Sequence, residues 1–344
     1  MSPNLSLLLR ESAEAPAAVA RLLAANEAAC RDLGARLRAR PPRFVVTCAR
    51  GSSDSAAMYA KYLIEIALGT VVASVGPSVA SIYGARPRMG DALFIAVSQS
   101  GRSPDLLKLA EAAREDGALT VALINEAHSP LAERCEIVLP LHAGAERSVA
   151  ATKSYIASLA SILQLVSHWG DDLDLVEAVR RLPDDLADAL VADWREALPL
   201  LTDTESLYAA GRGPGFAAAL EAAIKLKETC GIHAEALSAA ELMHGPMALA
   251  GPRFPVLLFS QNDAALPGLT ALAASLVDRG VPVLAAGPVA GEGTLALPSP
   301  EGLHPFVEPI ALVQSFYPLV EALARVRGRD PDKPPFLSKV TETR

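Results

Sequence analysis

Short apolar runs alternate with longer amphipathic stretches along most of the 344-residue chain. The runs are almost continuously apolar, as expected for strands covered on both faces in a parallel sheet. The stretches between them have helical spacing, so the alternation predicts βαβ units. The predicted strands are Phe44–Cys48, Val71–Val75, Ala92–Val97, Thr120–Ile124 and Ile137–Leu141, followed by Leu207–Ala210, Val256–Phe259 and Val281–Ala286.

A chain of this length is expected to form two domains, each with its own core. We predict an N-terminal helical segment (1–40), a first α/β domain (41–170), a charged helical connector (171–198) cut by Pro183, a second α/β domain (199–328) and a polar tail (329–344). The predicted helices are Glu11–Arg40, Ser55–Leu68, Asp105–Asp116, Lys153–His168 and Pro305–Arg327.

The two predicted domains repeat one strand–loop–helix pattern. Phe44–Gly51 matches Leu207–Gly213, and Phe94–Gln99 matches Val256–Gln261. Arg50 then aligns with Arg212 and Ser98 with Ser260, both at an offset of 162 residues. The second pair then diverges, because the first copy continues with serines and a glycine and the second continues as Asn262-Asp263. Small hydroxylated residues can hold an anion, whereas an added carboxylate repels it. The first half is therefore predicted to hold phosphate, and the second is not.

Two loops of the first half are expected at the ligand-binding edge of its sheet, beyond the carboxyl ends of the strands. Each leads into a predicted helix, whose first turn offers unpaired N–H donors and a positive dipole end. Either loop alone could be an ordinary turn with a serine N-cap. Two such loops in one sheet favour an anion site, although Asp54 would have to turn away from the anion. The candidate residues are Gly51, Ser52, Ser53, Ser98, Gln99, Ser100 and Ser103.

A second cluster of candidates lies in the second half. Lys225 and Glu228 are three residues apart and share a helix face, and Gly231 is expected to end that helix. A carboxylate at this position could move a proton between carbons. His244 precedes a Gly-Pro turn and is predicted to lie on a loop. Spacing alone leaves two readings open, since a Lys–Glu pair is often a solvated helix face and a loop histidine is often a surface residue.

Composition narrows the possible partners. The net charge of −8 and a pI near 5.4 argue against nucleic acid, which requires a basic surface. The four cysteines are widely spaced and form no metal-binding or disulfide pattern, so we expect no metal and a reducing, cytoplasmic setting. The N-terminal apolar stretch Leu7–Leu9 is too short for a signal peptide. No apolar run approaches the length of a membrane span, so no membrane partner is expected.

Ser98–Asp105 (SQSGRSPD) together with Lys225–Pro246 (KLKETCGIHAEALSAAELMHGP) resembles the isomerase half of glucosamine-6-phosphate synthase, from about residue 44 to 344. The resemblance implies two tandem sugar-isomerase (SIS) domains, each a doubly wound, flavodoxin-like parallel sheet flanked by helices. It also implies a homodimer and no cofactor. The implied phosphate ligands are Ser53, Ser98, Gln99, Ser100 and Ser103, with Gly51 and Ser52 lining the pocket.

The same resemblance assigns chemistry to the second cluster. It implies that Glu228 moves the proton between C1 and C2 of the sugar, assisted by Lys225. His244 would open the sugar ring from the neighbouring subunit. The tail Ser338–Thr341 would form a lid whose Lys339 can make a Schiff base with the open-chain ketose.

Several positions depart from the family pattern. Ala151 stands where a serine contacts the sugar, Met243 replaces a lysine before the ring-opening histidine, and Arg102 replaces a glutamate in the phosphate loop. The sequence shows no glutamine-hydrolysing part, and Ser2 stands where a nucleophilic cysteine is expected. These changes affect the expected sugar specificity more than the reaction type.

The leading hypothesis is therefore a hexosamine-phosphate deaminase/isomerase that converts glucosamine 6-phosphate to fructose 6-phosphate and ammonia. A fructosamine-6-phosphate deglycase and a galactosamine-6-phosphate deaminase remain open because of Ala151. A non-catalytic sensor of sugar phosphates is the alternative of another class. It would need the serine loop but not Lys225, Glu228 and His244 together.

Overall fold

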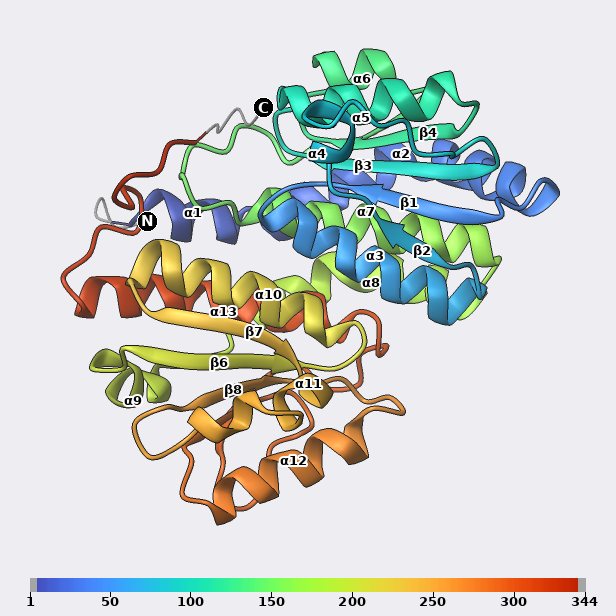
Figure 1. Ribbon diagram of the computed structural model, residues 1–344. Coiled ribbons are helices and arrows are strands. Elements are labelled where there is room, and N and C mark those ends of the chain that lie inside the picture. Colours follow the sequence, from blue (N-terminus) through green and yellow to red (C-terminus); the bar gives the residue numbers. More distant parts are fainter. Residues whose placement is uncertain (1–4, 340–344) are drawn as a thin grey trace. The chain divides into compact units, whose positions relative to one another are not determined.

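The computed structural model describes residues 5–339, which form two compact units. The first unit contains residues 17–146, 153–180 and 338–339. The second unit contains residues 5–16, 147–152 and 181–337. Each unit is built around one five-stranded sheet (Figure 1).

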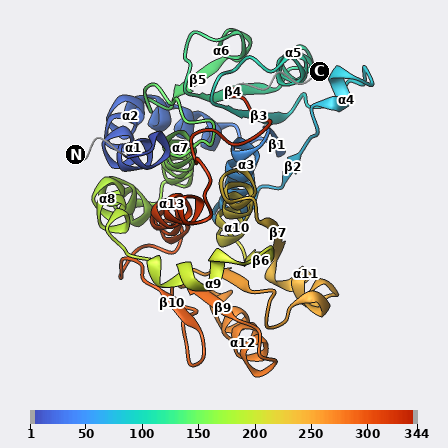
Figure 2. The same cartoon turned by 90° about the vertical axis from the view of Figure 1, so that its left-hand side faces the viewer.

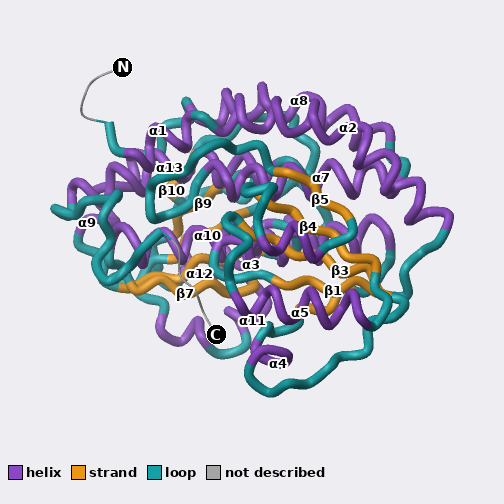
Figure 3. Tube along the Cα trace, turned by 90° about the horizontal axis from the view of Figure 1, so that it is seen from above, coloured by secondary structure: helices purple, strands orange, loops and turns teal. Residues whose placement is uncertain are grey.

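All strands of the first sheet are parallel, in the order β2-β1-β3-β4-β5. This is the flavodoxin-like order of a doubly wound sheet. Figure 3 shows these strands running side by side between helices. The strands are β1 (Phe44–Cys48), β2 (Val72–Ser74), β3 (Ala92–Ser98), β4 (Leu119–Ile124) and β5 (Ile137–Pro140).

Helices cover both faces of the first sheet (Figure 1). On one face α3 packs against α7, and on the other α5 and α6 contact β4. The apolar core of this second face includes Phe94 and Ile124 from the sheet and Leu106 and Leu109 from α5. Helix bounds are α2 (Ala15–Ala39), α3 (Ser52–Leu68), α4 (Ser78–Ser81), α5 (Pro104–Glu115), α6 (Pro130–Arg134) and α7 (Lys153–Gly170).

The second sheet has the order β7-β6-β8-β9-β10, again entirely parallel. Numbered within its own unit, this is the same strand order as in the first sheet, so the repeat seen in the sequence is a repeat of topology. The strands are β6 (Ser206–Gly211), β7 (His233–Ser238), β8 (Val256–Phe259), β9 (Val283–Ala286) and β10 (Leu295–Leu297).

The second sheet is also covered on both faces, by α10 and α13 on one and by α12 on the other (Figure 2). Leu258, Leu272 and Leu276 lie in the core beneath α12. The other helical bounds are α1 (Leu7–Ala13), α8 (Leu173–Leu190), η1 (Arg195–Ala197), α9 (Leu198–Thr202), α10 (Gly215–Lys225), η2 (Leu226–Cys230), α11 (Ala239–Met243), η3 (Pro246–Leu249), α12 (Leu266–Asp278) and α13 (Glu308–Val326).

The predicted fold class is confirmed, and every predicted strand overlaps an observed one. The predicted break at Pro183 is wrong, because α8 continues through this residue. A proline inside a helix costs about 3 kcal/mol. Burial of Leu182 and Leu186 next to it, worth about 1.5–3 kcal/mol each, offsets that cost. None of the helices within residues 5–339 is long and apolar enough to cross a membrane.

Candidate functional site

The loop after β1 opens α3 with a glycine in the left-handed region. Gly51 is the N-cap of α3 and has φ +57°, and no neighbouring atom lies within 4 Å of where a Cβ would stand. The backbone conformation, rather than lack of space, therefore favours glycine here. Ser52 and Ser53 follow in the first turn of the helix. Backbone donors and the positive helix end favour an anion at such a turn.

The loop after β3 lies at the same edge of the first sheet, because β1 and β3 are parallel neighbours in register. Ser98 is buried, and its Oγ accepts a hydrogen bond from the Gly101 amide at 3.0 Å. Gly101 has φ +63°, and a Cβ there would stand 2.3 Å from Ile124 Cδ1 and 2.3 Å from Ser129 Oγ. Both conformation and space therefore require glycine at this point of the loop.

This loop offers hydrogen-bond donors that the protein does not use. Ser103 is the N-cap of α5, but its side chain makes no capping hydrogen bond. Within residues 5–339, the backbone amides of Ser100, Arg102 and Ser103 donate to no protein acceptor. Ser100 and Ser103 are half-buried. Several unpaired donors at one helix start are the requirement for binding an anion.

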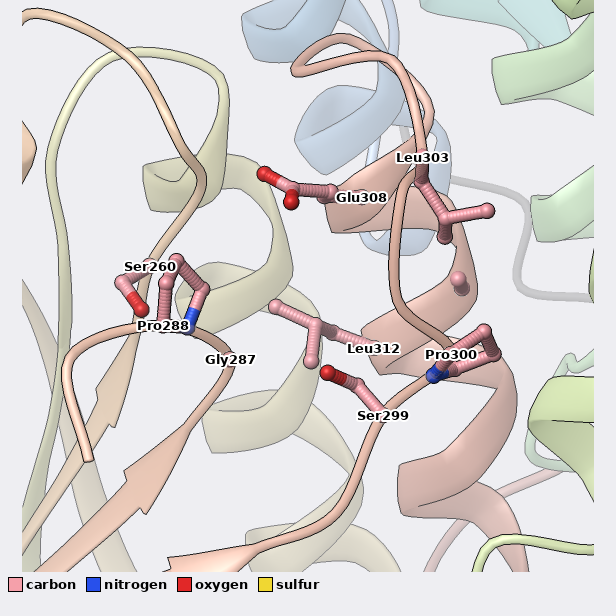
Figure 4. A pocket seen from close by; sticks show the side chains of 9 residues that line it. Ser260, Gly287, Pro288, Ser299, Pro300, Leu303, Glu308 and Leu312 are labelled. Carbon is pink, nitrogen blue, oxygen red and sulfur yellow. The ribbon is translucent and has the colours of Figure 1, made fainter.

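The corresponding loop of the second unit is satisfied by the protein's own carboxylates. Glu308 extends from α13 towards the loop that begins at Ser260 (Figure 4), and its Oε2 accepts the Asn262 amide at 2.5 Å. Asp263 Oδ1 accepts the Ala265 amide, and Asp263 Oδ2 accepts Gln261 Nε2, both at 2.8 Å. Burial raises the pKa of Glu308, an effect that the Asn262 amide opposes and the Asp263 charge reinforces.

The hollow beside Glu308 also leaves no room for a water molecule. Its polar lining includes Ser260, whose Oγ donates to the Ala286 carbonyl and accepts from the Val289 amide, each at 3.0 Å. In the second loop, carboxylates therefore accept the Asn262 and Ala265 amides, whereas the amides of Ser100, Arg102 and Ser103 in the first loop have no such acceptor within residues 5–339. The phosphate site expected in the first loop from the divergent repeat stays a prediction.

Lys225 lies in a buried charge cluster of the second unit. Its Nζ stands 3.2 Å from Glu221 Oε1 and 3.1 Å from Glu228 Oε2. The side chain of Glu221 is fully buried, whereas that of Glu228 is 28% exposed. The Tyr317 hydroxyl donates to Glu221 Oε1 at 3.2 Å. Burial alone would lower the pKa of Lys225, but Glu221 and Glu228 raise it overall.

A π-helical turn places Glu228 at the end of α10. The regular helix ends at Lys225, and residues Leu226–Cys230 continue with wider turns. Gly231 closes them in the left-handed conformation with φ +64°, and its amide donates to the Leu226 carbonyl. Gly231 therefore ends the helix as predicted, but the helix widens first. Single π turns of this kind are frequent at functional sites.

His244 caps α11 and is exposed, at the carboxyl end of the β7–α11 segment. Gly245 follows with φ +152°, and Pro246 starts the short helix η3, so the predicted turn is present. His233 is also exposed, but it is the first residue of β7 and lies at the opposite end of that strand. The Lys225–Glu228 cluster ends just before β7 begins, so within the second unit it lies at the His233 end of this strand and His244 lies at the other end.

Within the first unit, the described end of the tail is held by an ion pair. Lys339 Nζ donates to Glu146 Oε2 at 3.0 Å, and the Glu146 side chain is fully buried. The amide and hydroxyl of Ser154 also donate to Glu146. Ala151 is half-buried and belongs to the second unit. Val340 and Thr341 of the predicted lid lie outside the described residues.

The structure brings the predicted residues together in two groups. The loops Gly51–Ser53 and Ser98–Ser103 share one edge of the first sheet. Lys225 contacts Glu228 in the second unit. Sequence reasoning missed Glu221 and Tyr317. The spacing of Glu221 and Lys225, four residues apart, is the signal that could have identified Glu221. Tyr317 lies 96 residues from Glu221 and left no local signal.

The described residues contain no metal-binding cluster and no exposed thiol. Within the described residues, no group of three or more His, Cys, Asp and Glu could hold a metal ion. All four cysteines are buried and free of disulfide bonds. Burial raises the pKa of Cys30 and Cys48 to about 12 and that of Cys135 and Cys230 to about 11. These thiols are therefore neutral at pH 7 and poor nucleophiles.

Comparison with known proteins matches a family model described as "SIS domain" to residues 40–168 and 200–311. Glutamine–fructose-6-phosphate aminotransferase (isomerizing) from Thermotoga maritima is 34% identical over 317 residues, which is 86% of this chain and 50% of the relative. The chain thus spans about half the length of such curated relatives.

Among solved structures, a candidate phosphosugar isomerase from Silicibacter pomeroyi is 44% identical, with a TM-score of 0.89 over 95% of this chain and 100% of that one. Glucosamine-6-phosphate deaminase from Thermotoga maritima shares the fold at 20% identity, with a TM-score of 0.78 over 98% of this chain and 100% of that one.

Proposed function

Since the chain belongs to the SIS-domain family, we propose that it is a hexosamine-phosphate deaminase/isomerase. The proposed reaction converts glucosamine 6-phosphate to fructose 6-phosphate and ammonia. The observation that carries the proposal is the Lys225 ammonium, which lies within 3.2 Å of Glu221 and of Glu228 in the following π turn. A sensor of sugar phosphates has no need for a buried cation beside a partly exposed carboxylate.

In this proposal the first unit binds the phosphate. Ser53, Ser98, Gln99, Ser100 and Ser103 act as ligands, with Gly51 and Ser52 lining the pocket. The unpaired amides of the Ser98–Ser103 loop and the unused Ser103 hydroxyl support this role. In the second unit, by contrast, Glu308 and Asp263 use the donors of the matching loop. We therefore expect one sugar phosphate per chain.

Glu228 carries out the proton transfer. Its carboxylate removes the proton from C2 of the opened aldose, and the electrons form a C1–C2 double bond. The same group then returns the proton to C1, which leaves a C2 imine. The adjacent Lys225 ammonium stabilises negative charge that develops on the substrate oxygen. Water adds to the imine carbon, and ammonia leaves to give the ketose.

Two further residues complete the proposed site. His244 transfers the protons of ring opening; its exposure is consistent with service to a site in a second copy, as in the expected homodimer. Lys339 can form a Schiff base with the ketose once its ammonium leaves Glu146 and loses a proton.

The test is incubation of the purified protein with glucosamine 6-phosphate, with ammonia and fructose 6-phosphate measured separately. In D2O the product should carry one solvent deuterium at C1, as expected for a carboxylate that exchanges its proton. Glu228→Gln should lower turnover about 10²–10⁴-fold, the usual contribution of a general acid–base group. Phosphate binding should persist in this variant, which shows that it is folded.

Galactosamine 6-phosphate and 6-phosphorylated fructosamines should be tested in parallel, because Ala151 lacks the hydroxyl that the family uses on the sugar. Preference for one of these would replace glucosamine 6-phosphate as the substrate. Absence of turnover with every hexosamine phosphate, together with retained phosphate binding, would reject the enzyme in favour of a sugar-phosphate sensor.

A further inference from the structure

Arg50 ties together the two loops of the first unit. It immediately precedes Gly51, and its Nε and Nη2 donate to Asp105 Oδ2 at 3.1 and 2.7 Å. Asp105 lies in the first turn of α5, two residues after Ser103, and its side chain is fully buried. The Arg50 side chain therefore contacts the start of α5, which follows the Ser98–Ser103 loop, while the Arg50 backbone belongs to the loop before α3.

The ion pair leaves part of the guanidinium available. Both hydrogen bonds go to a single oxygen of Asp105, and within residues 5–339 Nη1 donates to no acceptor. The Arg50 side chain is 48% exposed, although its partner is fully buried. A planar guanidinium held along one edge by a fixed carboxylate keeps its remaining donors in a defined orientation. Such donors are well suited to phosphate oxygens.

Arg50 also balances negative charge beside the proposed phosphate site. Asp54 lies in the first turn of α3, and Asp105 lies in the first turn of α5. Burial raises the pKa of Asp54, and the charge of Arg50 opposes that shift, so this cation acts on both carboxylates. Without a compensating cation, ionised Asp54 and Asp105 would repel a phosphate dianion bound between the two loops.

The repeat supplies a natural comparison. Arg212 occupies the matching position of the second unit, and its Nη1 donates to Ser238 Oγ at 3.3 Å. Beside it, Asp263 and Glu308 occupy the loop amides. Arg50 is thus paired with a buried carboxylate beside the Ser98–Ser103 loop. Arg212 is paired with a neutral hydroxyl beside the loop whose amides donate to Glu308 and Asp263.

We propose that Arg50 is a ligand of the substrate phosphate and that its charge allows a loop flanked by Asp54 and Asp105 to accept a dianion. This inference rests on the proposed phosphate site of the first unit. It does not depend on which sugar the phosphate carries or on the reaction that follows. The competing role is purely structural, with Arg50 acting only as the partner of Asp105.

The experiment measures binding of inorganic phosphate and of glucose 6-phosphate by calorimetry, without turnover. Arg50→Gln should weaken both ligands roughly 10- to 100-fold, the range for a charge-assisted hydrogen bond. Arg50→Lys should recover part of the loss because it keeps the charge. Arg212→Gln is the matched control and should bind both ligands as the wild type does. Added NaCl should weaken binding to the wild type more than to Arg50→Gln.

Two further variants separate direct binding from support of Asp105. Asp105→Asn keeps the cation, and Arg50→Gln/Asp105→Asn removes both charges and so leaves no unpaired buried carboxylate to unfold the protein. If Arg50 contacts the anion, Asp105→Asn binds phosphate at least 10-fold more tightly than Arg50→Gln/Asp105→Asn. Equal affinity of these two variants would overturn the inference and leave Arg50 a structural partner only.

The outcomes also separate this inference from the proposed reaction. Wild-type phosphate binding that depends on Arg50, with no turnover of any hexosamine phosphate, rejects the reaction and supports the inference. Turnover with normal phosphate affinity in Arg50→Gln supports the reaction and rejects the inference. A wild type that binds neither inorganic phosphate nor glucose 6-phosphate rejects both.

Discussion

Replacing Lys225 by methionine should expose how far the second unit depends on its buried charge cluster. The change keeps most of the side-chain volume but removes the ammonium that stands 3.2 Å from Glu221 and 3.1 Å from Glu228. Glu221 would keep the neutral Tyr317 donor, yet its buried carboxylate would lose the ammonium that stands 3.2 Å away. Loss of one partner from a buried pair costs about 3–5 kcal/mol. Glu228 adds little to this cost, because it is partly exposed to water.

The assay is urea unfolding followed by tryptophan fluorescence. The chain has two tryptophans, Trp169 in the first unit and Trp194 in the second. In a Trp169→Phe background, Trp194 reports the unit that contains Lys225. Lys225→Met should lower the free energy of unfolding by about 3–5 kcal/mol at an unchanged slope with urea.

The matched control adds Glu221→Gln to Lys225→Met, which removes the unpaired carboxylate. The double variant should regain about 1–3 kcal/mol of the loss, as expected for residues in direct contact. It should not regain turnover, because Lys225 is still absent. A loss below about 1 kcal/mol in Lys225→Met, or further destabilisation by the second change, would refute the ion-pair account.

Three other outcomes follow from the structure. Gly101→Ala should destabilise the first unit by about 2–5 kcal/mol, because left-handed strain is combined with a clash against Ile124 and Ser129. Gly51→Ala should cost only about 1–2 kcal/mol, because its Cβ meets no neighbouring atom. Equal losses in thermal or urea unfolding would contradict this account. Burial raises the pKa of Cys48 from 9.0 to about 12, so the folded state keeps its proton longer than the unfolded chain, and this stability is present below pH 9.0 and lost as the pH rises towards 12. Cys48→Ala should therefore lose less stability than the wild type between pH 9 and 11, by up to about 1.4 kcal/mol per pH unit, and parallel urea-unfolding curves would argue against a thiol held neutral. His244→Ala should lower turnover of the cyclic substrate about 10²–10⁴-fold and leave phosphate affinity within about twofold, and an unchanged kcat would remove His244 from ring opening.

The sequence by itself determined the features that depend on neighbouring residues. Buried apolar runs identified the parallel strands, and the repeated pattern identified two sheets of one topology. Gly231 marked the helix end, and the three-residue spacing of Lys225 and Glu228 placed them in contact. Strand β7 was missed because its residues, His233–Ser238, include two alanines and a glutamate and contain no β-branched or aromatic residue of the kind that favours strands.

Only the tertiary structure decided which groups complete each cluster. Arg50 meets Asp105 across 55 residues, Tyr317 meets Glu221 across 96, and Lys339 meets Glu146 across 193. Local periodicity reports burial and direction within one element, but it carries no information on which distant element packs against it. Charge partners and the π turn depend on that packing. The sequence therefore indicated candidate site residues, and the fold supplied the buried partners that they contact.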